Sequence, residues 1–147
     1  MRLEFATKAR TLALLQTKLT SANILPLQII TVKEWLQDKK GCIDRIDKSF
    51  CNNSLIVRSS CNREDRSEHS NAGAFLSIQN VKPEKLKSAI EKVIEAFGIA
   101  DPTDEILIQP MLTNVIRSGV AFSHDPNTCA PYRVVNWSEG KNTTTVT

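Results

Sequence analysis

The fold of this chain is best predicted from one stretch, Leu55-Ile56-Val57-Arg58-Ser59-Ser60. Its β-branched apolar run predicts a short strand. An arginine and two serines lie at the end of this strand. A polar segment follows, and Gly73 then opens a second apolar run, Phe75-Leu76-Ser77-Ile78, which predicts a returning strand. A polyphosphate can be bound by an arginine at a strand end together with neighbouring hydroxyl groups. The backbone amides of a loop that contains a glycine can add further hydrogen bonds. The stretch therefore predicts a nucleotide-handling protein.

The composition indicates an ordinary globular domain. The chain has 147 residues, of which 41% are hydrophobic and 24% are charged, as is usual for soluble globular proteins. The net charge is +3, from 19 basic and 16 acidic residues that are interspersed along the chain. This balance favours a solvated surface over a nucleic-acid interface, and the few aromatic residues do not alternate with basic ones. We therefore expect no nucleic-acid partner.

The cysteines and the apolar runs bear on metal binding and location. None of Cys42, Cys51, Cys61 and Cys129 belongs to a C-x-x-C pair or to a Cys/His cluster with zinc spacing. No secretion signal opens the chain, and no run approaches the roughly 18 apolar residues of a membrane span. The expectation is a cytoplasmic protein with reduced thiols, no metal ligands and no membrane partner.

Helix and strand signals follow one another without strict alternation. Helices are predicted over residues 8–19, where Thr7 can cap the first turn, and from a Thr31–Glu34 capping box to near Gly41. Further helical segments are predicted for one or two turns within 42–53 and over 83–97, where the apolar residues form one face. Strands are predicted over 24–30 (an edge strand or an extended entry segment), 55–57, 75–81 and 106–111, with a hairpin of 119–123 and 132–137. This order favours an α+β (mixed α/β) fold with a mostly antiparallel sheet and packed helices. The tail, 143–147, has the pattern of a strand cut short.

Four segments, in order along the chain, resemble the N-terminal nucleotide-binding region of the phosphoenolpyruvate synthase and pyruvate phosphate dikinase family. They are Lys8-Ala9-Arg10-Thr11-Leu12, Val57-Arg58-Ser59-Ser60 with Ala72-Gly73 closing its loop, Ile108-Gln109-Pro110-Met111, and Ser118-Gly119-Val120-Ala121-Phe122-Ser123-His124-Asp125-Pro126. Two departures stand out: His124 replaces a frequent arginine, and no glycine follows Lys8.

The resemblance implies a domain of the ATP-grasp type that binds ATP with Mg²⁺. In this family ATP gives a phosphoryl group to a carrier histidine on a separate domain, which passes it to pyruvate or another acceptor. Rifampicin phosphotransferases share the nucleotide-binding region, so the acceptor stays open. The family's metal ligands and its carrier histidine would lie C-terminal to residue 147. The resemblance thus implies that residues 1–147 are a single partial domain, truncated at its C-terminus and inactive alone, with no catalytic residue of its own.

Two basic residues are the first candidates for ATP binding. Arg58 can bind two phosphate oxygens at once through its planar guanidinium. The alternative is a structural arginine paired with Glu64 or Asp65. Lys8 opens a helix, where a cation opposes the helix dipole, which fits a residue kept for an anionic ligand. The alternative is a solvated surface lysine.

Three further residues complete the candidate ATP site. Gly73 would let backbone amides approach the phosphates, unless it is a simple turn glycine. Ser77 could add a hydroxyl from the returning strand. Gln109 is polar within an apolar strand, and its amide would recognise the adenine or ribose edge, unless it faces solvent. His69 and His124 fit surface or turn histidines better than catalysts.

A function of another class also fits these residues. A non-catalytic nucleotide-binding or regulatory module could keep the same fold without phosphoryl transfer.

Overall fold

The computed structural model describes residues 6–51, 53–61 and 76–140. The contacts within the chain divide it into two compact units, Met1–Met111 and Leu112–Thr147. The expectation of one partial domain over residues 1–147 stays a prediction. Gly73 and the tail 143–147 lie outside the described residues.

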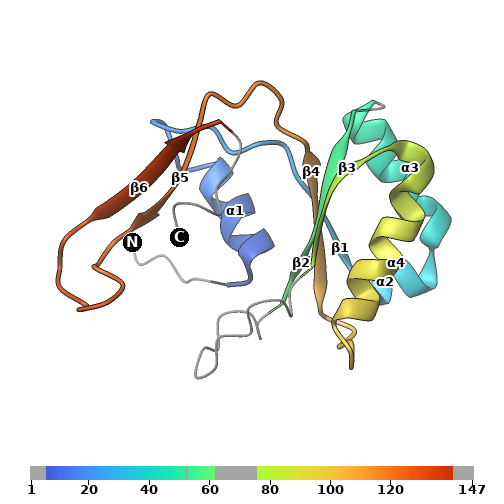
Figure 1. The fold of residues 1–147 in the computed structure, drawn as a ribbon. Coiled ribbons are helices and arrows are strands. Elements are labelled where there is room, and N and C mark those ends of the chain that lie inside the picture. The colour runs from blue at the N-terminus through green and yellow to red at the C-terminus, as the bar shows by residue number, and fades with distance from the viewer. Residues whose placement is uncertain (1–5, 52, 62–75, 141–147) are drawn as a thin grey trace. The chain divides into compact units, whose positions relative to one another are not determined.

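The first unit is a four-stranded sheet in the order β1-β4-β2-β3, with helices on both faces (Figure 1). Its elements are α1 (Lys8–Gln16), β1 (Gln28–Thr31), α2 (Val32–Gln37), α3 (Lys39–Phe50), β2 (Leu55–Ser60), β3 (Ser77–Val81), the 3-10 helix η1 (Pro83–Lys85), α4 (Leu86–Ala96) and β4 (Glu105–Pro110). Each pair of neighbouring strands is antiparallel. The α+β class with an antiparallel sheet and packed helices is therefore confirmed.

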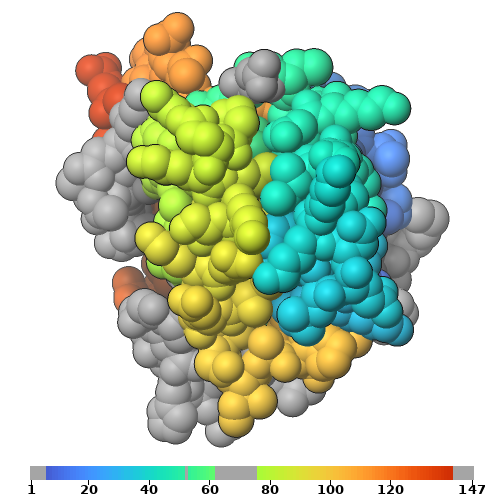
Figure 2. Space-filling view, turned by 90° about the vertical axis from the view of Figure 1, so that its right-hand side faces the viewer, coloured from blue at the N-terminus to red at the C-terminus, as the bar shows by residue number. Residues whose placement is uncertain are grey.

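Helices α2, α3 and α4 cover one face of this sheet, and α1 lies on the other (Figure 1). Figure 2 shows the outer surface of the three-helix layer, where α4 lies beside α2 and α3. Under this layer, Trp35 and Ile46 pack with Ile90 from α4 and with Val57 and Ile106 from the sheet, all at most 1% exposed. This apolar layer is the main core of the first unit.

Side-chain caps define where α1 and α2 begin. The Thr7 hydroxyl accepts a hydrogen bond from the Arg10 amide, as expected, although α1 ends at Gln16 and not near residue 19. The Thr31 hydroxyl accepts from the Glu34 amide while the Glu34 carboxylate accepts from the Thr31 amide, which completes the predicted capping box.

The prediction that this second helix continues to near Gly41 is wrong, for a local reason. Asp38 leaves the helical conformation, with φ −150° and ψ 78°, and its carboxylate accepts a hydrogen bond from the Gly41 amide. Asp38 thereby ends α2 and caps α3. Gly41 lies inside α3, which spans 12 residues and not the one or two turns expected.

The remaining elements fall close to their predicted positions. Pro83 begins η1 rather than α4 itself, and Gly98 follows α4 with φ +69°, a conformation that glycine adopts without strain. Strand β1 is at an edge of the sheet, as expected near Pro26. Strand β4 is central, and Glu105 to Gln109 are all buried.

The second unit contains the predicted hairpin, β5 (Arg117–Phe122) with β6 (Val134–Glu139), paired antiparallel. The Asp125 carboxylate accepts hydrogen bonds from the amides of Asn127 and Thr128 in the connection between the strands. These bonds lower the pKa of Asp125, the bond from Thr128 most. A Cβ at Gly119 would lie 2.4 Å from the carbonyl oxygen of Asn136, so this position requires glycine.

Within the described ranges, no helix has the length and apolar character needed to span a bilayer.

Candidate functional site

The two central strands present different chemistry on their two faces. Side chains alternate along a strand, so the residues between the core positions of β2 and β4 point away from the three-helix layer. Cross-strand pairing places Ser60 opposite Glu105, Arg58 opposite Leu107, and Ile56 opposite Gln109. Strand β3 adds Ser77, which pairs with Arg58. We name this surface the polar face; it comprises Ile56, Arg58, Ser60, Ser77, Glu105, Leu107 and Gln109.

Arg58 lies in the middle of the polar face. Its side chain is half-buried, and its Nε is a buried atom without a hydrogen-bond partner among the described residues. A buried donor left without a partner costs about 1–3 kcal/mol. An anion bound at this face would satisfy the guanidinium. The proposed pairing partners Glu64 and Asp65 lie outside the described residues.

Gln109 lies on the same face, two residues along β4 from the partner of Arg58. Its side chain is 8% exposed, so it does not face solvent. The side-chain Nε2 donates to the carbonyl oxygen of Leu25 at 3.5 Å, the long limit for a hydrogen bond. Such a weak bond leaves the amide able to bind a ligand.

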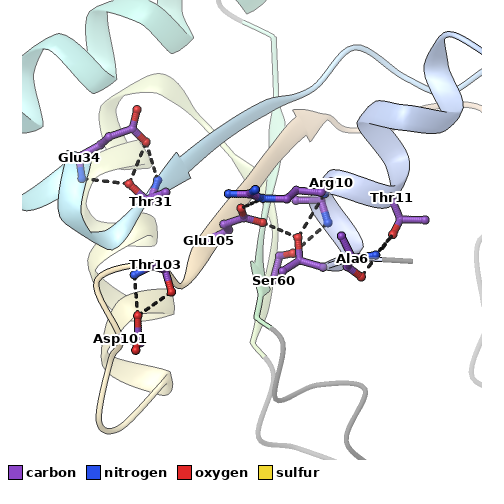
Figure 3. Close-up of polar contacts among 11 residues, drawn as sticks. Ala6, Arg10, Thr11, Thr31, Glu34, Ser60, Asp101, Thr103 and Glu105 are labelled. Atoms are coloured by element: carbon purple, nitrogen blue, oxygen red, sulfur yellow. Dashed lines mark hydrogen bonds and ion pairs between the residues drawn. The ribbon is translucent and has the colours of Figure 1, made fainter. Parts of the chain in front are cut away.

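Helix α1 is bonded to the polar face by its first turn (Figure 3). The Ala9 amide donates to the Ser60 hydroxyl at 2.9 Å, which satisfies an amide that a helix start leaves without a partner. The Thr7 hydroxyl donates to the Glu105 carboxylate at 2.5 Å, and Arg10 Nε donates to its other oxygen. Residues far apart in sequence therefore fix the start of α1 on β2 and β4.

Glu105 is the centre of this attachment, and sequence reasoning missed it. The residue is 1% exposed, although glutamate is seldom buried without a partner. Arg10 supplies the partner: its bond to Glu105 and the attraction between the charges raise the pKa of Arg10, because both favour the charged guanidinium. The one available signal was a carboxylate directly before the apolar run 106–108.

The predicted ATP-binding residues are partly brought together. Arg58 and Ser77 are paired neighbours, and Gln109 shares their face on the next strand. Lys8 is the first residue of α1, is half-buried and precedes the residue bonded to Ser60. Gly73 lies outside the described residues. His124 is an exposed residue of the second unit.

Two cavities that described residues line contain no residue of the polar face. Over the described ranges, no group of three or more His, Cys, Asp or Glu side chains could hold a metal ion. One cavity of about 430 Å³ lies between β3 and α4. Another, of about 260 Å³, is lined by α2 and α3 residues such as Glu34, Cys42 and Arg45. Burial raises the pKa of the Cys42 thiol.

Comparison with protein-family models, with curated proteins and with solved structures found no match to this chain.

Proposed function

We propose that this chain is the ATP-binding portion of a phosphotransferase resembling phosphoenolpyruvate synthase, with an ATP-grasp type fold. The observation that carries the proposal is the arrangement around Arg58: a buried guanidinium nitrogen without a partner among the described residues, flanked by Ser77 and with Gln109 on the same face. Two of the four segments of the family resemblance, those of Arg58 and Gln109, thus meet on one surface.

Each residue has a chemical part in this proposal. Arg58 binds phosphate oxygens through paired, charge-assisted hydrogen bonds. The Ser77 hydroxyl donates to a neighbouring oxygen. Gln109 offers both a donor and an acceptor, which the edge of adenine or ribose can pair with. Lys8, at the start of α1, adds a positive charge at the rim.

The attachment of α1 supports this arrangement. The bonds from Ala9 to Ser60 and from Thr7 and Arg10 to Glu105 hold the helix start on the polar face. Glu105 is therefore a positioning residue for Lys8. Because its carboxylate is bonded to Arg10 and Thr7, it does not oppose a bound phosphate as an unpaired negative charge would.

The Mg²⁺ ion that the family resemblance implies would need ligands from elsewhere. No candidate set of ligands occurs among the described residues. In the proposal, the metal ligands and the carrier histidine belong to parts of the phosphotransferase outside residues 1–147.

The proposal is tested by calorimetric titration of the 147-residue chain with ATP. We expect saturable binding that Arg58→Ala weakens at least tenfold, since a charge-assisted bidentate contact is worth more than about 1.4 kcal/mol. Arg45→Ala is the matched control, because it removes an arginine from the three-helix layer. Equal binding by the wild type and Arg58→Ala would remove Arg58 from the site.

The same protein distinguishes catalysis from binding. We expect no phosphoryl transfer from ATP by the chain alone. Transfer by the purified chain would contradict the proposed division of the enzyme. If ATP binds and the complete protein also lacks transfer activity, the non-catalytic nucleotide-binding module is the correct function.

A further inference from the structure

The cavity between β3 and α4 lies apart from the proposed ATP site and has its own chemistry. Its volume of about 430 Å³ lies within the range of small-molecule sites. Its apolar wall is formed by Ile78, Val81 and Ala89, of which Val81 and Ala89 are at most 5% exposed. Its other lining residues are polar or basic: Gln79, Asn80, Lys85, Ser88 and Lys92.

The charged residues that line this cavity have one sign. Lys85 and Lys92 line it, and no acidic residue among those the structure describes does. Neither lysine side chain has a hydrogen bond or an ion pair with another part of the chain that the structure describes. Glu91 of α4 is paired with Lys39 of α3 at 2.9 Å, so its charge is already compensated. A cleft lined by charges of one sign raises the local concentration of counter-ions.

The spacing of these groups along η1 and α4 lets them converge. Ser88 and Lys92 are four residues apart on one side of α4, and Lys85 ends η1 directly before α4 begins. The two lysines are about 10 Å apart along the axis, by the helical rise per residue. Because lysine carries its ammonium on a flexible four-carbon stem, both can reach an anion placed at Ser88.

Strand β3, which also lines the cavity, has an irregular register. Leu55 pairs with Val81 and Val57 with Ile78, so β3 has an extra residue between them, which forms a β-bulge. Within it, Asn80 has φ +55°, which is uncommon for a residue other than glycine. Bulges re-aim side chains near binding sites, and Gln79 and Asn80 line this cavity.

From this geometry we propose a second ligand site between β3 and α4, for a small phosphorylated molecule. The phosphoryl group binds to the ammonium groups of Lys85 and Lys92, with the Ser88 hydroxyl and the bulge amides donating hydrogen bonds. The less polar part of the molecule packs against Val81 and Ala89. The site shares no residue with the polar face, so this proposal can be tested separately from the proposed ATP site.

The probe for this site is inorganic pyrophosphate, titrated into the ¹⁵N-labelled 147-residue chain at low ionic strength. We expect saturable chemical-shift changes at the amides of Gln79, Asn80 and Ser88. The double variant Lys85→Gln, Lys92→Gln should weaken this binding at least tenfold. The variant Lys40→Gln, Lys48→Gln removes the same charge from exposed positions of α3 and should change the affinity less than twofold.

Two further measurements distinguish this site from binding at the polar face and from unspecific binding of anions. Arg58→Ala should leave the changes at Asn80 and Ser88 intact, whereas their loss would assign them to the polar face and overturn the proposal. Citrate, a polyanion without phosphorus, should bind at least tenfold more weakly than pyrophosphate. Equal binding of citrate, equal weakening by both double variants, or no saturable change at these amides would each contradict a phosphate site.

Discussion

The two faces of the four-stranded sheet differ in what fills them. On the face toward α2, α3 and α4, Val57, Ile106 and Ile108 are fully buried among apolar side chains. On the polar face, the same strands carry Arg58 and Glu105. The first arrangement stabilises a fold through burial of apolar area. The second places charged and polar groups where they cost stability unless they have partners.

The charged residues of the polar face differ in whether they have partners among the described residues. Glu105 is fully engaged by Thr7 and Arg10 and holds α1 in place. Arg58 has a buried nitrogen, Nε, without a partner among the described residues. Local departures from consistent packing are expected at functional sites.

The largest effect is expected from the apolar face. Ile106→Ala removes a fully buried side chain from the core and should lower the free energy of unfolding by about 3–4 kcal/mol. Ile99→Ala, at a position 89% exposed, is the control and should change it by less than about 0.5 kcal/mol. Urea denaturation followed by circular dichroism measures both. Similar losses for the two variants would contradict the assignment of the core.

A smaller loss of stability is expected where α1 is attached to the sheet. Arg10→Ala leaves the Glu105 carboxylate, with its side chain 2% exposed, without its cationic partner. Breaking a buried pair in this way costs about 3–5 kcal/mol, which we reduce to about 2 because Arg10 is 63% exposed and Thr7 still donates. The double variant Arg10→Ala, Glu105→Gln removes the unpaired charge and should recover part of that loss. A double variant less stable than Arg10→Ala would contradict this account of the pair.

A still smaller, pH-dependent effect is expected in the three-helix layer. The pKa of Glu34 is lowered from 4.5, first by the bond from the Thr31 backbone, so folding is favoured by the charged carboxylate. This contribution is present above pH 4.5 and is lost as the pH falls through the lower pKa of the folded state. Glu34→Gln should therefore destabilise at pH 7 by less than about 1 kcal/mol, since the site is exposed, and should match the wild type in strong acid.

Thermal unfolding at several pH values measures that difference, with Glu95→Gln as a control at an exposed position of α4. A Glu34→Gln effect that grows toward acid would reverse the predicted sign.

The smallest change in stability is expected at Arg58 itself. Arg58→Leu replaces a side chain that has an unsatisfied buried nitrogen with an apolar one, so the free energy of unfolding should fall by no more than about 0.5 kcal/mol or should rise. ATP binding should be lost in the same variant. A large loss of stability on urea denaturation would show that Arg58 is a structural residue.

The fold could be predicted from sequence where local signals were strong. The Thr31–Glu34 capping box, the apolar side of α4 and the β5–β6 hairpin depend on neighbouring residues, and each is found. The boundary between α2 and α3 was missed because Asp38 both ends one helix and caps the next. No spacing rule distinguishes that double role from a continuous helix.

The candidate site was less accessible to sequence reasoning, because it depends on long-range pairing. The register that places Ser77 and Gln109 beside Arg58 is a property of the folded sheet. Glu105 was missed because hydrophobic patterns predict that a glutamate is exposed, and its partners lie 95 or more residues away. Residue type identified Arg58, but only the fold shows its neighbours.

The most direct test of the polar face is a titration of the ¹⁵N-labelled chain with ATP, read amide by amide. We predict saturable shift changes along β2 and β4 and at the start of α1, centred on Arg58 and Gln109, with little change in α3. We expect these shift changes to be lost in Arg58→Ala and kept in Arg45→Ala, which would show that they depend on Arg58. Changes confined to α3, or no saturable change near Arg58, would contradict the claim that the polar face binds ATP.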